Sequence, residues 1–83
     1  MYNVIVSDDA FKELSRIDKS NQRIIYQKMK LLEEGQFTGD KPLKGKHNGK
    51  FRKRAGNYRI IYLRENSILL ITVIRIAHRK EVY

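Results

Sequence analysis

Three arginines around a predicted hairpin turn are the side chains of this sequence best suited to chemistry. Arg52 and Arg54 alternate before the dipeptide Gly56-Asn57, and Arg59 follows it. A two-residue turn at that dipeptide pairs Arg54 with Arg59 and puts all three arginines on one face of the hairpin. Like charges directly opposite each other destabilise a strand pair, whereas guanidinium groups bind phosphate through two parallel hydrogen bonds. The pattern therefore predicts a phosphate-binding site.

A second group of candidate residues lies at the C-terminus, where the last predicted strand leaves the sheet. His78 and Arg79 are adjacent, and Tyr83 ends the sequence. A histidine with an ordinary pKa of about 6.5 can exchange protons near neutral pH, and a tyrosine ring can stack on a nucleic-acid base. A lone histidine is more often structural, but a position beside an arginine face makes His78 a candidate for proton transfer. His47, in a Lys- and Gly-rich segment, is expected on the surface.

The positive charge is concentrated in one segment. The formal net charge is +9, yet residues 1–40 hold six Lys/Arg and seven Asp/Glu, while residues 41–64 hold nine Lys/Arg and no acid. A block of one sign repels itself and is typical of proteins with a polyanionic partner, so nucleic acid is the leading partner class and an acidic protein the second. The lysines expected to contact the nucleic acid are Lys41, Lys44, Lys46, Lys50 and Lys53.

Composition excludes several classes of protein. A chain of 83 residues predicts one small domain over residues 1–83. Because it has no cysteine, disulfides, zinc–thiolate sites and thiol nucleophiles are excluded. Two histidines and scattered carboxylates favour no metal site and no cofactor. The longest apolar run is far shorter than the roughly 20 residues that span a bilayer, and no secretion signal opens the sequence. We expect neither secretion nor membrane insertion.

Two helices are predicted in the N-terminal half. The apolar stripe of the first is formed by Ala10, Leu14 and Ile17. Either Ser7 or Asp8 can cap its first turn. The second helix is expected over residues 21–34, with Ser20 as its N-cap and Gly35 as the first residue after it. The apolar stripes are interpreted as core.

The second half has the two-residue period of strands. Beyond a connector over residues 35–49, strands are predicted over residues 51–55, 58–63 and 68–76. The last is apolar on both faces, which is typical of a strand inside a sheet. Lys53 is the exception on the otherwise apolar face of the hairpin. With a short opening strand over residues 2–6, the order is β-α-α-β-β-β. This is an α+β domain with two helices on one face of a small, mostly antiparallel sheet.

Four segments together resemble the RelE/ParE superfamily of type II toxin–antitoxin toxins, nearer to the RelE branch. They are Leu43-Lys44-Gly45, Phe51-Arg52-Lys53-Arg54, Gly56-Asn57-Tyr58-Arg59-Ile60-Ile61-Tyr62 and the ending His78-Arg79-Lys80-Glu81-Val82-Tyr83, which is similar to the family's HR-x-(D/E)-V-Y. The resemblance covers the whole chain. It implies a metal-independent endoribonuclease that cleaves mRNA in the ribosomal A site, in the cytoplasm of a bacterium or archaeon. The implied partners are a cognate antitoxin, the ribosome with its mRNA, and operator DNA bound by the toxin–antitoxin complex.

The resemblance also implies a role for each candidate. Arg52 and Arg54 match the family's basic pair, and Arg59 matches the arginine that contacts the scissile phosphate. Arg79, or else His78, matches the general acid, and Tyr83 the tyrosine that stacks on a base. The best-understood RelE toxins have lysines in place of the basic pair. Because arginine is a poor general base, removal of the 2′-OH proton would rest on the histidine, the tyrosine or the RNA itself.

Two other functions compete with this interpretation. A ParE-like toxin would keep the fold, bind DNA gyrase and cleave nothing. A plain RNA-binding module would bind without reaction, but no aromatic pair accompanies Arg54 and Arg59 on their face. The adjacent His78 and Arg79, with the density of arginine, favour the endonuclease. In either toxin, an acidic or amphipathic antitoxin segment is expected to cover the basic sheet.

Overall fold

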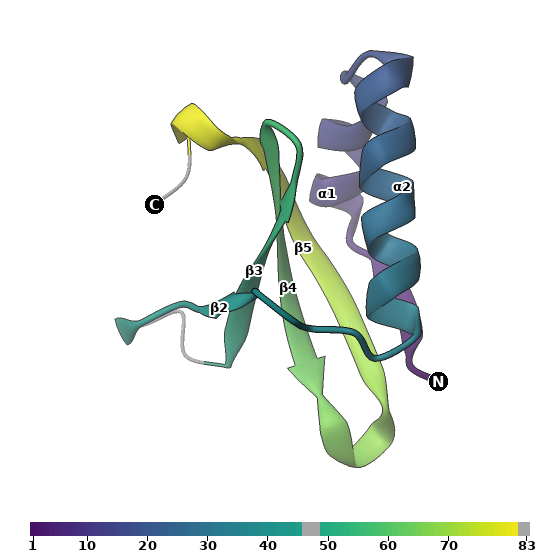
Figure 1. Ribbon diagram of the computed structural model, residues 1–83, viewed down its shortest axis with the longest axis vertical. Coiled ribbons are helices and arrows are strands. Elements are labelled where there is room, and N and C mark those ends of the chain that lie inside the picture. Colours follow the sequence, from purple (N-terminus) through teal and green to yellow (C-terminus); the bar gives the residue numbers. More distant parts are fainter. Residues whose placement is uncertain (46–48, 82–83) are drawn as a thin grey trace.

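The computed structural model describes residues 1–45 and 49–81. Its helices and strands are β1 (Asn3–Val6), α1 (Asp8–Ser15), α2 (Lys19–Glu33), β2 (Lys41–Pro42), β3 (Lys50–Ala55), β4 (Tyr58–Glu65) and β5 (Leu70–His78). Two 3-10 turns, Asn66–Ile68 and Arg79–Glu81, flank β5. Both helices lie on the same side of the sheet (Figure 1), which confirms the predicted α+β class and layering. The sequence interpretation missed the two-residue strand β2.

Each helix begins at a side-chain cap. The Ser7 hydroxyl accepts a hydrogen bond from the Ala10 N–H at 3.1 Å and begins α1. The cap of α2 is Asp18, whose carboxylate accepts from the Asn21 N–H at 3.3 Å. The expectation that Ser20 is this cap is wrong. The helix begins at Lys19, before Ser20, and the Ser20 hydroxyl donates to the Asp18 carboxylate at 2.6 Å. A carboxylate that accepts several hydrogen bonds is stabilised in its charged form.

The Asp18 cap should therefore depend on pH. Hydrogen bonds from the Asn21 side chain, the Ser20 hydroxyl and the Asn21 backbone lower the pKa of Asp18 from 3.8 to about 2. Since the folded-state pKa is the lower one, the cap stabilises the fold above pH 3.8, and this contribution is lost as pH falls through about 2. Asp18→Asn keeps a capping side chain without the titration. We expect the thermal midpoints of the two proteins to converge over that range, and parallel pH profiles would contradict this assignment.

Gly35 ends α2 as predicted. Its φ is 75°, in the left-handed region that favours glycine. The Gln36 N–H donates to the Leu31 carbonyl at 2.9 Å and the Gly35 N–H to the Leu32 carbonyl at 3.0 Å. This paired arrangement satisfies the last free carbonyls of the helix. It also directs the chain out of α2 towards the connector that carries β2.

The sheet is mixed, with the strand order β1-β5-β4-β3-β2. β1 runs parallel to β5, and all other neighbours are antiparallel. β5 lies between β1 and β4, which confirms that it is an interior strand, although it begins at Leu70. The residues before it form a 3-10 turn, and Leu69 has a φ of 51°. Ile68 and Leu69 are 62% and 48% exposed, so the apolar pattern there placed the strand start too early.

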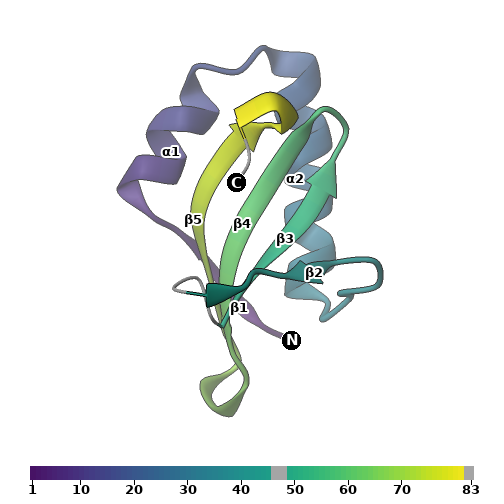
Figure 2. The same cartoon turned by 90° about the vertical axis from the view of Figure 1, so that its left-hand side faces the viewer.

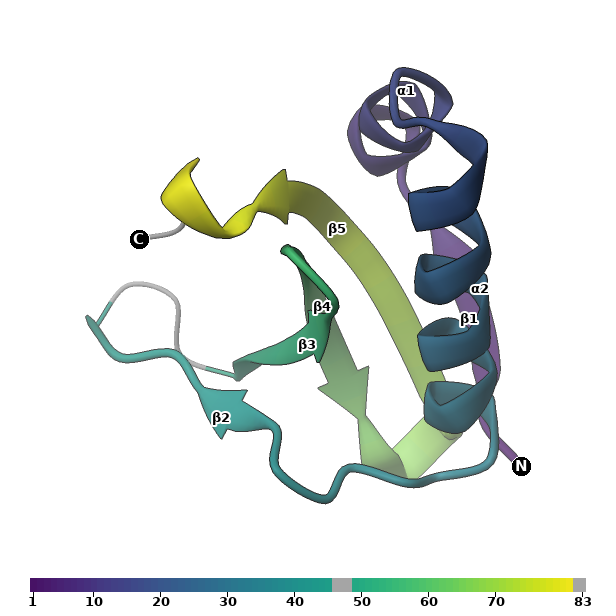
Figure 3. The same ribbon diagram turned by 45° about the horizontal axis from the view of Figure 1, so that its top comes forward.

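The hydrophobic core fills the space between the helices and one face of the sheet. Its buried members are Ala10, Leu14, Ile25, Leu32, Ala55, Ile60, Tyr62, Ile71, Val73 and Ile76. The other face of the sheet carries no helix and is seen from its open side in Figure 2. In Figure 3 the helices lie on one side of the strands, while β2 and the C-terminal turn lie on the other. This open face is where a functional site can form.

Glu13 of α1 closes the edge of β5 beyond the end of β1. Its two carboxylate oxygens accept from the Ile76 N–H and from Nε of Arg75, each at 2.8 Å. A backbone N–H on a buried edge needs such a partner. The contact fixes α1 against the upper part of β5, on the helix-covered side of the sheet.

Candidate functional site

The three arginines meet in one pocket on the open face of the sheet. Arg54 pairs with Arg59 across β3 and β4, and Arg52 pairs with Ile61, as the turn at Gly56-Asn57 predicts. Directly opposite residues point to the same face. Lys41 of β2 pairs with Arg52 from the other side. The five residues that line this hollow of about 200 Å³, called here the basic pocket, are Gly39, Lys41, Arg52, Arg54 and Arg59.

The charges in the basic pocket are not balanced by any acid that lines it. Burial, followed by the charges of Arg54, Arg52 and Arg79, lowers the pKa of Arg59. An arginine remains protonated at neutral pH even so. The crowded guanidinium groups therefore raise the energy of the empty site, and a bound phosphate would relieve it through charge-assisted hydrogen bonds.

Arg79 lies near the basic pocket because the turn that follows β5 is hydrogen-bonded to the hairpin turn between β3 and β4. Its backbone N–H donates to the Asn57 carbonyl at 2.8 Å. The 3-10 turn that contains it, the yellow segment of Figure 2, lies beside the end of the β3–β4 hairpin. The Arg79 charge is among the causes that lower the pKa of Arg59. The structure thus brings Arg79 together with Arg52, Arg54 and Arg59.

The structure does not bring His78 to the basic pocket. His78 pairs with Tyr58, and the next pair along the strands is Ala77 with Arg59. Because side chains alternate between faces, the histidine points to the helix-covered side. Its ring meets Tyr58 edge-on at 5.3 Å and lines a hollow with Glu13 of α1. The expectation that His78 stands beside the arginines is wrong.

The lysines predicted to contact RNA lie in different places in the structure. Lys41 lies inside the basic pocket. Lys44 is exposed, and Lys50 is half-buried at the start of β3, on the face of Arg52. Lys46 and Tyr83, like His47, lie outside the described residues. Among the described lysines named so far, Lys41 is therefore the one that lines the pocket.

Lys53 is buried and cannot contact RNA, so that expectation is wrong. Its side chain faces the core side of β3 and the residue is 4% exposed. Nζ lies 3.0 and 3.2 Å from the two carboxylate oxygens of Asp40 and 3.1 Å from the Gln36 carbonyl. The Tyr62 hydroxyl donates to the same carboxylate at 2.5 Å. The carboxylate of Asp40 therefore neutralises Lys53 behind the arginine face, inside the protein.

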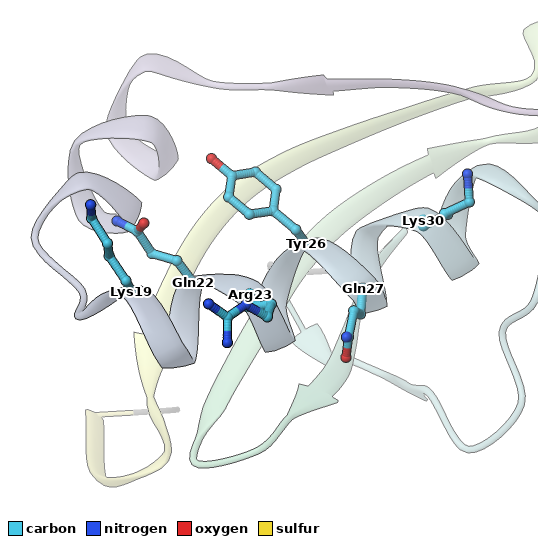
Figure 4. A pocket seen from close by; sticks show the side chains of 6 residues that line it. All are labelled: Lys19, Gln22, Arg23, Tyr26, Gln27 and Lys30. Atoms are coloured by element: carbon cyan, nitrogen blue, oxygen red, sulfur yellow. The ribbon is translucent and has the colours of Figure 1, made fainter.

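A second cationic surface, which the sequence interpretation missed, lies on the exposed side of α2. It surrounds a shallow hollow of about 500 Å³ lined by Lys19, Gln22, Arg23, Tyr26, Gln27 and Lys30 (Figure 4). Tyr26, among the residues that line this hollow, is 54% exposed. Since α2 covers the helix side of the sheet, this surface and the basic pocket face away from each other. Helical spacing was the signal that could have found it, because these residues recur three or four positions apart.

Metal-binding and membrane-spanning features were also sought in residues 1–45 and 49–81. Within those ranges no three His, Asp or Glu side chains gather as a metal site would require. Neither of the helices there is both long and apolar enough to cross a membrane.

One protein-family model matches nearly the whole chain. It is described as the ParE toxin of the type II toxin–antitoxin system parDE, and the match spans residues 4–83. A search of curated protein sequences found no match.

Solved structures of the same fold cover the chain almost completely. The archaeal RelE–RelB complex from Pyrococcus horikoshii has a TM-score of 0.82 at 23% identity, with 98% of each chain covered. The YoeB/ParE toxin from Agrobacterium tumefaciens has a TM-score of 0.78 at 20% identity, with 94% of this chain and 98% of that chain covered. The isolated Escherichia coli RelE toxin has a TM-score of 0.76 at 16% identity, with 94% of this chain and 84% of that chain covered. At these identities the likeness shows a shared fold.

Proposed function

We propose that this chain, which belongs to the ParE toxin family of type II toxin–antitoxin systems, is a toxin that blocks translation by cleaving mRNA in the ribosomal A site. The observation that supports the cleavage reaction is the basic pocket. Arg52, Arg54 and Arg59 converge there with Arg79 nearby, and no acid lines the hollow. Such an arrangement suits a phosphodiester whose negative charge grows in the transition state.

The proposed reaction needs no group other than the RNA and the protein. The 2′-oxygen attacks the adjacent phosphorus, the bond to the 5′-oxygen breaks, and the products are a 2′,3′-cyclic phosphate and a 5′-OH. Arg59, flanked by Arg52 and Arg54, stabilises the charge on the phosphoryl oxygens. Arg79 donates the proton to the leaving 5′-oxygen.

Removal of the 2′-OH proton falls to a group other than His78, which lies on the opposite face of the sheet. The protonated guanidinium groups of the pocket are poor bases. We assign this proton to a non-bridging phosphoryl oxygen of the RNA or to Tyr83. The sequence alone had left the histidine as an equal candidate.

The partner that holds the toxin inactive is proposed to be a cognate antitoxin. The solved relative from Pyrococcus horikoshii is a complex of RelE with RelB. An acidic antitoxin segment over the basic pocket would neutralise the crowded arginines and block the phosphate position. The exposed Lys44 and the half-buried Lys50 of β3 would add contacts to ribosomal RNA that weaken steeply with salt.

Primer extension on mRNA in programmed ribosomes tests the reaction. We expect cuts in the A-site codon with the purified protein, and no cuts without ribosomes. A substrate with 2′-deoxyribose at the cleavage position is expected to remain intact, because the nucleophile is missing. Equal cleavage of the deoxy and ribose substrates would contradict the proposed 2′-OH attack.

A second candidate function is that of a gyrase inhibitor without nuclease activity. It is favoured by the family description, which names the ParE toxin, and by the absence of a general base among the residues that line the basic pocket. In that case the arginines form a docking surface. Growth arrest with a trapped gyrase–DNA complex and uncut mRNA would support this function over the first.

A further inference from the structure

We propose that Asp40 is a positioning residue for the basic pocket, acting through its buried ion pair with Lys53 and its hydrogen bond from Tyr62. The inference rests on the proposed phosphate-binding role of the pocket. It adds to that role a polar network on the opposite side of β3, which touches neither RNA nor the reacting atoms.

The network is almost completely buried. The side chains of Lys53 and Asp40 are 6% and 5% exposed, and Tyr62 is fully buried. One carboxylate oxygen of Asp40 accepts a hydrogen bond from Lys53 Nζ at 3.0 Å. The other oxygen accepts from Lys53 Nζ at 3.2 Å and from the Tyr62 hydroxyl at 2.5 Å. In the described ranges, no buried side-chain nitrogen or oxygen is left without a partner. The carboxylate is thus held from two strands, β3 and β4.

Each partner of the ion pair is a chain neighbour of the pocket wall. Gly39 and Lys41, on either side of Asp40, line the basic pocket. Because side chains alternate along a strand, Arg52 and Arg54 reach the pocket from one face of β3 while Lys53 leaves from the other. The ion pair therefore joins the two adjacent segments that supply pocket residues, Gly39–Lys41 and β3, from behind the pocket.

The segment that carries Gly39 and Lys41 is held to β3 by a short pairing. β2 is two residues long and pairs through Lys41 and Pro42, and the Leu43 N–H donates to the Lys50 carbonyl at 2.9 Å. The preceding turn is closed by the Asp40 N–H donating to the Phe37 carbonyl at 3.0 Å, with Gly39 at a φ of 84°. Phe37 stacks on Tyr62 at 6.2 Å, which holds the start of the segment. Between Phe37 and β2, the Asp40 carboxylate adds the ion pair and the hydrogen bond that join this segment to Lys53 of β3 and Tyr62 of β4.

Stability alone does not account for this network. Replacing a buried ion pair with well-packed apolar side chains is often neutral or stabilising, since both charges lose their hydration. What charged hydrogen bonds add is direction, because their donors and acceptor must keep a fixed geometry. A phosphate pocket made of long arginine and lysine side chains needs its backbone supports fixed in this way.

Titration with inorganic phosphate, followed by the Nε–Hε NMR signals of the pocket arginines, tests the inference without nuclease activity. The main variant replaces all three polar groups with apolar ones: Asp40→Leu, Lys53→Met and Tyr62→Phe. We expect it to fold with a thermal midpoint at or above that of the parent, and its phosphate dissociation constant to rise about tenfold. The control is Glu13→Gln, which changes the carboxylate that binds Arg75 and the Ile76 N–H at the edge of β5. We expect its phosphate binding to equal that of the parent.

The outcomes separate the two proposals. If the parent and the triple variant bind phosphate equally, Asp40 does not position the pocket, although the proposed function survives. If the parent itself does not bind phosphate at these arginines, both proposals are overturned. Should the triple variant fail to fold, Tyr62→Phe takes its place, because it leaves the ion pair intact. A smaller rise of the dissociation constant in that variant supports the inference, and no rise overturns it.

Discussion

Replacing Arg59 with alanine is expected to slow mRNA cleavage in programmed ribosomes by about 10²–10³-fold, the usual effect of losing one preorganised donor to a transition-state anion. Burial, and after it the charges of Arg54, Arg52 and Arg79, lower the pKa of Arg59, so this arginine is the one that the other cations surround. It also faces Arg54 directly across the hairpin. Single-turnover primer extension, with the ribosome saturated by the protein, gives the rate.

The same substitution should leave the fold intact. Arg59 brings repulsion from like charges to the hairpin, and its recorded side-chain hydrogen bond is to the neighbouring Tyr58 carbonyl at 3.2 Å. Arg23→Ala is the matched control, because it removes one exposed cation from α2 on the other side of the sheet. If Arg23→Ala slows cleavage as much as Arg59→Ala, the pocket is not special and total charge dominates. If Arg59→Ala unfolds the protein, the arginine is structural.

The arginine cluster could be predicted because its geometry is local. A two-residue turn fixes the register of both strands, so Gly56-Asn57 determines which residues oppose one another. The predicted pairs of Arg54 with Arg59 and of Arg52 with Ile61 are those of the structure. Gly56 has a φ of 62°, in agreement with the turn.

The position of His78 could not be predicted in the same way. Its face depends on the register of β4 against β5, which are connected by a 3-10 turn and a left-handed Leu69 instead of a tight hairpin. The register also shifts between Ile61 and Tyr62, and one such irregularity reverses which residues share a face. Proximity to Arg79 in sequence therefore did not mean proximity to the basic pocket.

The buried ion pair shows a different limit. The alternation of the hairpin placed Lys53 on the core face, which already indicated an unusual lysine. Its partner could not be found, because Asp40 belongs to a Gly-rich connector without periodicity. The cationic surface on α2 was not predicted from the sequence for a related reason. Residues 1–40 hold nearly equal numbers of basic and acidic side chains, and it is the helical fold that brings Lys19, Arg23 and Lys30 to one hollow.

Replacing Lys53 alone with methionine is expected to lower the free energy of unfolding by about 3–5 kcal/mol, the usual cost of leaving one charge of a buried pair without its partner. Asp40 would keep only the Tyr62 hydroxyl as a side-chain donor, in a site where its side chain is 5% exposed. Urea unfolding of the parent and the variant measures the difference. A loss below about 1 kcal/mol, the size of a surface ion pair, would contradict the burial of this pair.

Removing the polar groups that Lys53→Met leaves without partners should restore the free energy of unfolding in two steps. Adding Asp40→Leu to Lys53→Met removes the stranded carboxylate, so most of the lost free energy should return. The buried Tyr62 hydroxyl then lacks its acceptor, which costs about 1–3 kcal/mol until Tyr62→Phe removes that donor too. The three substitutions are therefore expected to be strongly non-additive, with the triple variant more stable than Lys53→Met alone. Additive losses across the series would mean that the three side chains act separately, and the support behind the arginine wall would be packing and not a polar network.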